Sequence, residues 1–305
     1  MSYFSRKITS AQLAKICEVS QGTVDRALNN RSDISPATKE KIIAAAKKYG
    51  YIPNIEKSSS GSKSMLFGIV IFNLYNEYFS RLVMEIESIS KIHGYSTVIM
   101  FSDKDKASEI DCINRLIFMG VDGIILCPVT NDSGAYLNSL NIPVVTVGNK
   151  IDEVSYSGID DFKAMSDVTE YVISKNHEKI IYYAPPLKYM ENENIYAQKE
   201  RFSGFLAAIK EHNHFVTTDI DEVTDHSAVI CSTDYHALQV IHKRGGKISG
   251  IIGFDDINIL SLCDIMLDTV SYSTAKIAEN AVNSLLSPCF KCDFVQHTIV
   301  IRGSF

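Results

Sequence analysis

A run of small and polar side chains at residues 20–26 is the first candidate for a chemical role. Val24, Ala27 and Leu28 recur at helical spacing within and after it, and Ser20 is of a type that caps helix N-termini. The predicted helix exposes the polar members of the run, which are Gln21, Gly22, Thr23, Asp25 and Arg26. An arginine there can donate two parallel hydrogen bonds to a guanine edge in the major groove of DNA. The pattern favours a helix that reads base pairs.

Two further helices are predicted around this one. Thr9 and Gln12 have the spacing of a capping box, and Leu13, Ala14 and Ile16 follow as an apolar face. Glu18 and Val19 make a short turn before the second helix. Ser35 and Pro36 open a third helix, which carries Ile42, Ile43, Ala46 and Tyr49 and ends at Gly50. This arrangement is the scaffold of a helix-turn-helix. An ordinary three-helix bundle is the alternative, and the polar face of the second helix favours DNA reading.

Charge divides the chain in the same place. Residues 1–60 hold ten Lys or Arg and five Asp or Glu, whereas the remaining residues hold 20 basic and 31 acidic ones. A basic head on an acidic body is typical of a phosphate-binding module on a body that does not bind DNA, although a solvated basic surface would look the same. The sequence contains no apolar run long enough for a membrane span and no signal-peptide pattern, so we expect a cytoplasmic protein with no membrane partner.

Other chemistry is poorly represented. The seven cysteines are odd in number and scattered, which favours free thiols. Only Cys289 and Cys292 have a chelating or redox spacing, and a single such pair is a weak signal. The eight histidines show no metal-binding spacing, and the sequence lacks the glycine-rich, HExxH and GxSxG motifs of enzymes. We therefore expect no enzymatic activity, no cofactor and no metal.

From residue 65 onward, apolar strands alternate with helices. Strands are predicted at residues 66–72, 96–101, 122–128, 142–148, 179–184, 228–232 and 250–254. Helices are predicted near 80–93, 107–119, 162–174, 198–211 and 235–244. Continuous apolar strands between helices indicate parallel sheets covered on both faces, and their number exceeds one simple sheet. The fold class is thus α/β: a small all-α helix-turn-helix head and a two-lobed parallel-sheet body.

The quoted head residues resemble the DNA-binding head of LacI-type regulators, most specifically in VSQGTVDRALN and the closing YGYIPN. The resemblance implies that Gln21, Gly22 and Arg26 face base edges and that Ser20, Thr23 and Asn29 hold phosphates, with Thr9 and Asp25 in the same DNA-binding set. Glu18 stands where the family usually has a turn glycine, which predicts a more strained turn. Asp25 replaces a common phosphate-binding serine, so its carboxylate must be paired or read a cytosine amino group.

A linker separates the two parts. We expect a head at residues 1–54, a linker or hinge at 55–64 and an effector-binding body at 65–305. In relatives this linker is a helix that wedges a leucine into the minor groove. Here residues 57–64 contain no leucine, and residues 58–62 hold four serines and Gly61, which favours a flexible tether and weaker kinking of DNA.

The body resembles the periplasmic sugar-binding-protein fold of the same family, through NEYFSRLVMEIE, GVDGIILCP, SGIDDFKA, QKERFSGFLAAI, STDYHAL and IIGFDD. It implies one lobe at about 65–160 and 273–289 and another at about 161–272 and 290–305, with a ligand between them. By the resemblance, the effector-binding residues are Asn76, Tyr78, Phe79, Arg201, Asp234, Asp255 and Tyr272. Gly148, Thr233 and Tyr272 replace common aspartate, asparagine and glutamine residues, which predicts a less polar pocket and a modified or phosphorylated sugar.

The sequence thus predicts a dimeric, allosteric transcriptional regulator, by expectation a repressor, whose affinity for double-stranded operator DNA depends on a sugar-like effector. A solute-binding or enzymatic α/β protein with an incidental helical cap is the alternative. The identity of the effector, the operator sequence, and whether the ligand releases or retains DNA stay open, as does the role of Cys289 and Cys292.

Overall fold

The computed structural model describes residues 8–28, 34–49, 63–184, 195–262 and 265–305. The chain divides into two compact units, and the boundary between them along the chain lies at Ser64 and Met65, although Ile113–Val121 is grouped with the first unit. We call the residues up to Ser64 the head and those from Met65 the body, and we describe each by itself. The predicted boundary at residue 54 and most of the predicted linker lie outside the described residues.

The head consists of three helices: α1 (Ser10–Cys17), α2 (Gln21–Leu28) and α3 (Pro36–Lys48). The capping box predicted for Thr9 and Gln12 is confirmed, with both reciprocal hydrogen bonds present. Ser20 and Ser35 cap the other two helices, because their Oγ atoms accept from the backbone N–H groups three residues on, at 3.1 and 3.2 Å. The capping residues Thr9, Ser20 and Ser35 therefore set where the three helices start.

Three fully buried side chains, Leu13, Val24 and Ile42, join the helices of the head in one apolar cluster. The expectation that Ile16 belongs to the apolar face of the first helix is wrong, since its side chain is 41% exposed, and Tyr49 is similarly exposed at 42%. Cys17 takes the buried position on α1, one residue beyond Ile16, because the helix turns that position toward α2 and α3.

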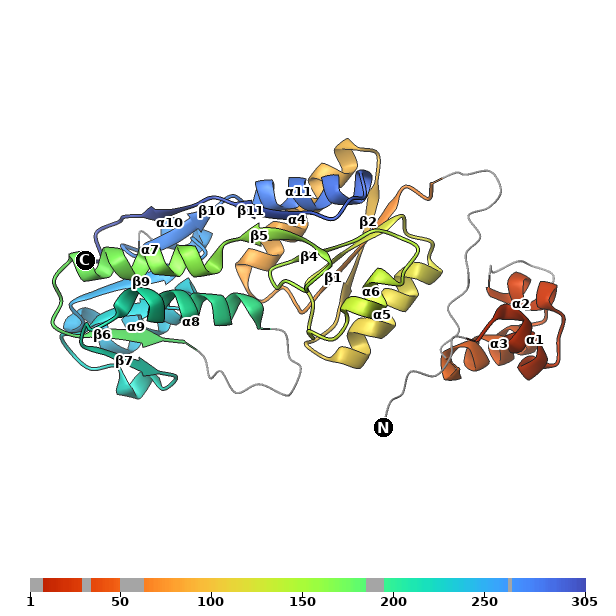
Figure 1. Cartoon of the computed structure of the whole chain (residues 1–305), viewed down its shortest axis with the longest axis horizontal. Helices are drawn as coiled ribbons and strands as arrows, with labels where there is room; N and C mark the ends of the chain where they lie inside the picture. The colour runs from red at the N-terminus through yellow and green to blue at the C-terminus, as the bar shows by residue number, and fades with distance from the viewer. Residues whose placement is uncertain (1–7, 29–33, 50–62, 185–194, 263–264) are drawn as a thin grey trace. The chain divides into compact units, whose positions relative to one another are not determined.

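The first lobe of the body is built on a six-stranded parallel sheet in the order β11-β5-β4-β3-β1-β2. Its strands are β1 (Leu66–Ile71), β2 (Ser96–Phe101), β3 (Gly123–Leu126), β4 (Val144–Val147), β5 (Ser155–Ile159) and β11 (Cys292–Val295). Its helices are α4 (Glu77–Ile92), α5 (Lys106–Phe118), α6 (Gly134–Asn138) and α11 (Thr274–Leu286). Helices α4 and α11 lie together on one face of the sheet (Figure 1).

The second lobe has a sheet of the same size in the order β12-β10-β9-β8-β6-β7. Its strands are β6 (Ile180–Tyr183), β7 (His214–Thr217), β8 (Ala228–Cys231), β9 (Gly250–Phe254), β10 (Asp268–Tyr272) and β12 (His297–Val300). Its helices are α7 (Asp161–Ser174), α8 (Tyr196–Ile209), α9 (Asp234–Arg244) and α10 (Asn258–Leu262), with single 3₁₀ turns at Ile220–Glu222 and Gly245–Lys247. Only β12 runs antiparallel to its neighbour, β10.

Helices α7 and α8 pack side by side on one face of this second sheet (Figure 1). A glycine permits their close approach, because a Cβ on Gly204 would lie 2.2 Å from the carbonyl oxygen of Phe162. A larger residue at position 204 would therefore push the helices apart.

The described chain passes between the two sheets three times, after β5, after β10 and between β11 and β12. The expectation that residues 290–305 all belong to the second lobe is wrong for β11. That strand pairs in parallel with β5 of the first sheet, where Cys292 lies opposite Tyr156, and Gln296 alone separates it from β12. The α/β fold class, with two parallel-sheet lobes and a helical head, is confirmed.

Candidate functional site

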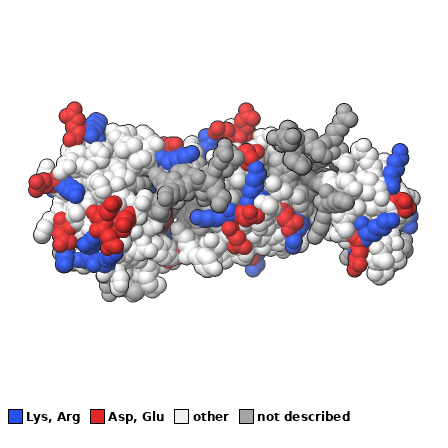
Figure 2. Space-filling view, turned by 90° about the horizontal axis from the view of Figure 1, so that it is seen from below, with Lys and Arg blue, Asp and Glu red and all other residues white. Residues whose placement is uncertain are grey.

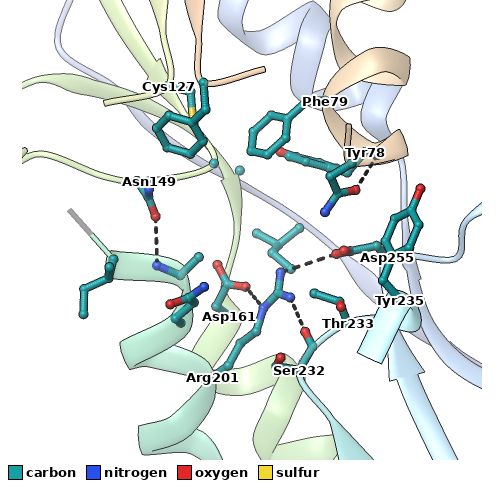
Figure 3. A pocket seen from close by; sticks show the side chains of 18 of the residues that line it. Tyr78, Phe79, Cys127, Asn149, Asp161, Arg201, Ser232, Thr233, Tyr235 and Asp255 are labelled. Atoms are coloured by element: carbon teal, nitrogen blue, oxygen red, sulfur yellow. Dashed lines mark hydrogen bonds and ion pairs between the residues drawn. The ribbon is translucent and has the colours of Figure 1, made fainter. Parts of the chain in front are cut away.

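A cavity of about 540 Å³ lies between the two lobes of the body (Figure 3). Its first-lobe wall includes residues after β1 and on α4, such as Phe72, Asn76 and Phe79, together with Cys127 after β3 and Gly148 after β4. Its second-lobe wall is more polar and includes Asp161, Arg201, Ser232, Thr233, His236 and Asp255. Most of these residues follow the carboxyl ends of strands, where ligands bind in parallel α/β folds.

Arg201 organises the second-lobe wall. Its Nε donates to Asp161 Oδ1 at 2.7 Å, its Nη1 to the Ser232 carbonyl at 2.8 Å and its Nη2 to Asp255 Oδ1 at 3.5 Å. The guanidinium carbon also lies 3.6 Å from the centre of the Phe254 ring, a stacking geometry that suits a planar cation. The arginine is therefore held from several sides and keeps two carboxylates in place at the cavity.

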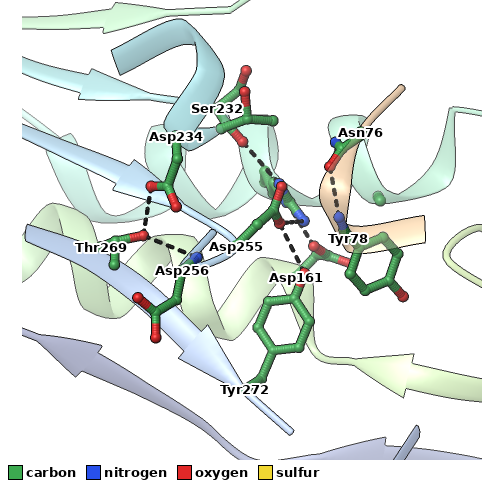
Figure 4. A network of polar contacts seen from close by, with 12 residues as sticks. Asn76, Tyr78, Asp161, Ser232, Asp234, Asp255, Asp256, Thr269 and Tyr272 are labelled. Atoms are coloured by element: carbon green, nitrogen blue, oxygen red, sulfur yellow. Dashed lines mark hydrogen bonds and ion pairs between the residues drawn. The ribbon is translucent and has the colours of Figure 1, made fainter. Parts of the chain in front are cut away.

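Asp255 is held in an unusual backbone conformation directly after β9. Its φ of 103° is rare for a residue with a side chain, and such strain persists only where the surroundings fix it. Tyr272 donates its hydroxyl to Asp255 Oδ1 at 2.8 Å (Figure 4). Two partners thus aim the Asp255 carboxylate at the cavity.

Burial shifts the protonation equilibria of this cluster. Desolvation raises the pKa of Asp161 to about 6 although Arg201 opposes the rise, and it raises the pKa of Asp255 in the same way. Burial by itself would lower the pKa of Arg201, but the two carboxylates raise it overall, so the guanidinium stays charged. Arg201 thus keeps its charge between Asp161 and Asp255, and its proximity opposes the rise in the pKa of both carboxyl groups.

The three candidate residues of the first lobe all line the cavity. Asn76 also caps α4, because its Oδ1 accepts from the Tyr78 backbone N–H at 2.9 Å. The rings of Tyr78 and Phe79 meet edge to face at 5.0 Å, and Tyr78 meets Tyr272 in the same way at 5.8 Å. The aromatic residues form a continuous apolar surface next to the Arg201 cluster.

Asp234 does not belong with these residues. Its side chain is fully buried outside the cavity lining, where it accepts from the Thr269 hydroxyl at 2.6 Å and the Ile257 backbone N–H at 3.0 Å (Figure 4). A Cβ on Gly253 would lie 2.1 Å from its Oδ1, so the strand passes directly against the carboxylate. Its expected contact with a ligand is therefore wrong, and it holds the loop that carries Asp255.

The three residues that depart from the family pattern, Gly148, Thr233 and Tyr272, all line the cavity. Thr233 caps α9 by accepting from the His236 N–H at 3.3 Å, and its side chain lines the cavity. Gly148 has a φ of 71°, and a Cβ there would lie 3.1 Å from Cys127 Sγ and 3.6 Å from the Phe79 ring. This part of the wall is therefore apolar and closely packed.

Asp161 and His236 are cavity residues that sequence reasoning missed. Asp161 stands at the start of α7 directly after β5, and Asp255 likewise follows a strand directly, so this placement is a signal that could have found Asp161. The His236 Nδ1 lies 2.9 Å from the Ser232 hydroxyl and 2.8 Å from that of Thr233, and burial lowers its pKa to about 4. The imidazole is therefore neutral at physiological pH.

Another carboxylate supports the first-lobe wall from behind. Glu109 is fully buried and accepts from the Val129 N–H at 2.6 Å and the Ser133 hydroxyl at 3.4 Å, while Val129 lines the cavity. Desolvation raises the pKa of Glu109 to about 7.

Both lobes also contact each other directly beside the cavity. Arg81 on α4 donates from Nη1 and Nη2 to the carbonyls of Asp256 and Asp255, both at 2.9 Å. Glu77 accepts from the Asn258 N–H at 2.7 Å, and Asn149 accepts from the Ala197 N–H at 3.3 Å. These bonds hold the lobes together around the cavity in this structure.

The second helix of the head exposes the expected polar face. Gln21, Gly22, Asp25 and Arg26 are exposed, and Thr23 is half-buried. Arg26 Nε donates to the Gly22 carbonyl at 3.1 Å, and Gln21 Nε2 donates to Ser10 Oγ at 2.6 Å.

Ser20, Thr23 and Thr9, which were also expected to contact DNA, have structural roles in the head. The hydroxyls of Ser20 and Thr23 are hydrogen-bonded at 2.8 Å, and Thr9 is an exposed cap. Asn29 lies outside the described residues. The strained turn expected at Glu18 is confirmed by its left-handed φ of 56° and ψ of 42°.

Several other features fall outside these sites. Charged side chains of both signs are interspersed over the second lobe in Figure 2, an arrangement of surface charges that contributes little to stability. The six described cysteines are free, with Cys289 exposed and Cys292 half-buried. Within the described residues, no cluster of three or more His, Cys, Asp or Glu could hold a metal ion, and no helix is long and apolar enough to cross a membrane.

Comparison with known proteins identifies the family. The family model described as periplasmic binding proteins and sugar binding domain of the LacI family matches residues 23–257. Catabolite control protein A of Staphylococcus epidermidis is 24% identical over 277 residues, covering 83% of this chain and 82% of that protein. The corresponding protein of Priestia megaterium is 25% identical over 293 residues, covering 86% and 87%.

Solved structures show the same fold. The lac repressor dimer bound to operator and the anti-inducer ONPF matches with a TM-score of 0.67 at 20% identity, covering 98% of this chain and 99% of that one. The CelR–cellobiose complex matches with a TM-score of 0.65, also at 20% identity, and covers 98% and 100%. These structures show the fold, and the family model, which matches more than half of the chain, shows that the chain belongs to the family of periplasmic binding proteins and sugar binding domains of the LacI family.

Proposed function

We propose that this protein is a transcriptional regulator, acting as a repressor, that binds operator DNA through α2 and a small sugar-like effector in the cavity of the body. The observation that carries the proposal is the exposed polar face of α2 on a capped three-helix head, in a chain whose body belongs to the LacI family. Since its target is DNA, we place the protein in the cytoplasm.

On DNA, Gln21, Gly22 and Arg26 contact base edges, while Ser20, Thr23 and Asn29 contact phosphates. Arg26 Nε donates to the Gly22 carbonyl within α2, and rotation of the side chain turns the guanidinium toward a guanine. Asp25 is exposed on the same helix and accepts from a cytosine amino group.

The protein acts as a homodimer, so that two heads reach two halves of a pseudo-palindromic operator. The relative with a solved operator complex is named as a dimer, which supports this arrangement. Effector binding changes the bonds that Arg81, Glu77 and Asn149 make between the lobes, and thereby the affinity for operator. The coupling is reciprocal, so operator must change effector affinity by the same factor.

A gel-shift titration with the upstream region of the protein's own gene tests the proposal. Arg26→Ala should weaken binding by about 1–3 kcal/mol and relax the preference at one position of the operator. Lys41→Ala, which removes a positive charge from an exposed position on α3, is the matched control and should weaken binding to all DNA sequences equally. If the unaltered protein shows no preference for any sequence over bulk DNA, the regulator proposal is wrong.

A further inference from the structure

The two walls of the cavity differ in chemistry. On the first-lobe wall, Phe72, Phe79, Cys127, Val129 and Gly148 present rings, a thiol, an alkyl group and bare backbone. Phe72 and Phe79 meet edge to face at 5.5 Å, and the Phe79 ring borders the space beside Gly148 and Cys127. We call Phe79, Cys127 and Gly148 the apolar subsite. A ligand group that fills it gains free energy from burial but finds few partners for its polar atoms.

The second-lobe wall offers two carboxylates as acceptors. Each of the three nitrogens of the Arg201 guanidinium already donates one hydrogen bond to a protein oxygen, and each carboxylate of its pair has room for further donors. A ligand that presents hydroxyl groups satisfies Asp161 and Asp255, whereas a ligand that presents only acceptors does not. This wall suits the hydroxyls of a sugar.

The charges around the cavity balance. Among the described lining residues, Lys104 and Arg201 are the cations and Asp161 and Asp255 are the anions, while burial keeps His236 neutral. The Lys104 ammonium lies 5.6 Å from the centre of the Phe72 ring, on the apolar side. A phosphate would bring two negative charges into a cavity whose lining is neutral overall, at a large cost in desolvation.

We propose that the effector is a neutral glycoside that carries an apolar substituent, with the sugar ring on Asp161 and Asp255 and the substituent in the apolar subsite. This inference rests on the proposed function and narrows its ligand, and it replaces the phosphorylated sugar that the sequence left open. A cavity of about 540 Å³ lies within the range that encloses drug-sized ligands and has room for both parts.

Isothermal titration calorimetry on the full chain tests the ligand class. The probes are glucose, galactose, mannose and fucose, each as the free sugar, the methyl glycoside and the phenyl glycoside in both anomers, with glucose, galactose and mannose also as the 6-phosphate. For at least one sugar, the phenyl glycoside should bind at least tenfold more tightly than the methyl glycoside, and a 6-phosphate should bind more weakly than its free sugar. Equal affinities of phenyl and methyl glycosides, tighter binding of a phosphate, or no binding in the panel would overturn the proposal.

Variants locate the substituent. Phe79→Ala should reduce the ratio of phenyl to methyl affinity about tenfold, while Phe290→Ala, an exposed aromatic outside the cavity lining, should leave it unchanged. If Phe79→Ala does not fold, Gly148→Ala adds a methyl group to the same subsite and should reduce the same ratio. An unchanged ratio in the folded variant places the substituent elsewhere and contradicts the inference.

The same preparations separate this inference from the proposed function. A gel shift without ligand reports whether the protein recognises an operator at all. Specific operator binding combined with failure of the phenyl glycosides rejects the ligand class and leaves the regulator proposal standing. Phenyl-glycoside binding without specific operator binding does the reverse.

Discussion

The head and the body use arginine in opposite ways. Arg26 on α2 is exposed and makes a bond to its own helix, whereas the Arg201 side chain is 11% exposed and is bonded to two carboxylates and a carbonyl. An exposed arginine can exchange its hydrogen-bond partners for one that supplies its own charge, such as DNA. A buried and paired arginine has lost that freedom and instead fixes the groups around it. The head therefore recognises DNA with exposed N–H donors that can reorient. The body recognises its ligand with carboxylate acceptors that Arg201 already holds in place.

We expect the largest effect on stability from removing Arg201, the buried arginine. Arg201→Ala leaves Asp161 and Asp255 buried at 2% and 5% side-chain exposure without their cation. We expect the free energy of unfolding to fall by about 3–5 kcal/mol, measured by urea denaturation at pH 7. Arg26→Ala is the matched control and should change it by less than about 0.5 kcal/mol, since surface substitutions act weakly on stability. An equal decrease in the free energy of unfolding in both variants would show that the two arginines do not differ in their contribution to stability.

A second prediction concerns pH and the buried carboxylate behind the first-lobe wall. Burial raises the folded-state pKa of Glu109 from 4.5 to about 7, so the folded state holds a proton that the unfolded state releases between these values. The contribution of Glu109 to stability is therefore full below pH 4.5 and is lost as the pH rises toward 7. Since each pKa unit corresponds to about 1.4 kcal/mol, the free energy of unfolding should fall by about 3 kcal/mol over this range.

Glu109→Gln keeps an acceptor for the Val129 N–H and a donor for Ser133, and it cannot ionise. The variant should therefore lose less stability than the unaltered protein between pH 4.5 and 7, measured by thermal and urea unfolding across that range. Glu87→Gln, an exposed glutamate on α4, serves as the control and should leave the slope unaltered. Parallel slopes for all three proteins would show that Glu109 is not protonated in the folded state.

The smallest expected effect lies in the turn of the head. Glu18 adopts a left-handed conformation that glycine takes without steric cost, and its ion pair with Lys41 at 3.8 Å is exposed on both sides. Glu18→Gly should therefore stabilise the head by about 0.5–1 kcal/mol, visible as slower exchange of the amide hydrogens of α1 and α2. Faster exchange in the variant would mean that the Glu18 side chain stabilises the turn.

Local signals in the sequence account for much of the fold. The caps at Thr9, Ser20 and Ser35 correctly start the three helices of the head, because each depends on residues at most three positions apart. Five body helices, α4, α5, α7, α8 and α9, were predicted to within three residues at each end, whereas α6, α10 and α11 were not predicted. Strand β5 (Ser155–Ile159) was not foreseen, because its sequence SYSGI is short and alternates polar residues, and pairing on both sides holds it in the sheet.

The cavity was harder to predict for a different reason. Asp161, Asp234 and Asp255 all follow a strand, and nothing in their local sequence distinguishes them. Only the packing within the second lobe turns Asp234 toward Thr269 and the other two toward Arg201. Family resemblance located the region of the site, but the division between ligand-facing and structural carboxylates requires three-dimensional contacts.

The three passages of the chain between the sheets determine what kind of motion the body allows. The passages join β5 to α7, β10 to α11 and β11 to β12. Strands β5 and β11 are neighbours at one edge of the first sheet, and β10 and β12 are neighbours at one edge of the second. Asp160 and Ser273, which begin two of the passages, also cap α7 and α11, and the third passage is the single residue Gln296. Connections this short resist sliding and permit rotation, so a small turn at this edge produces its greatest displacement near β2 and β7 at the opposite edges.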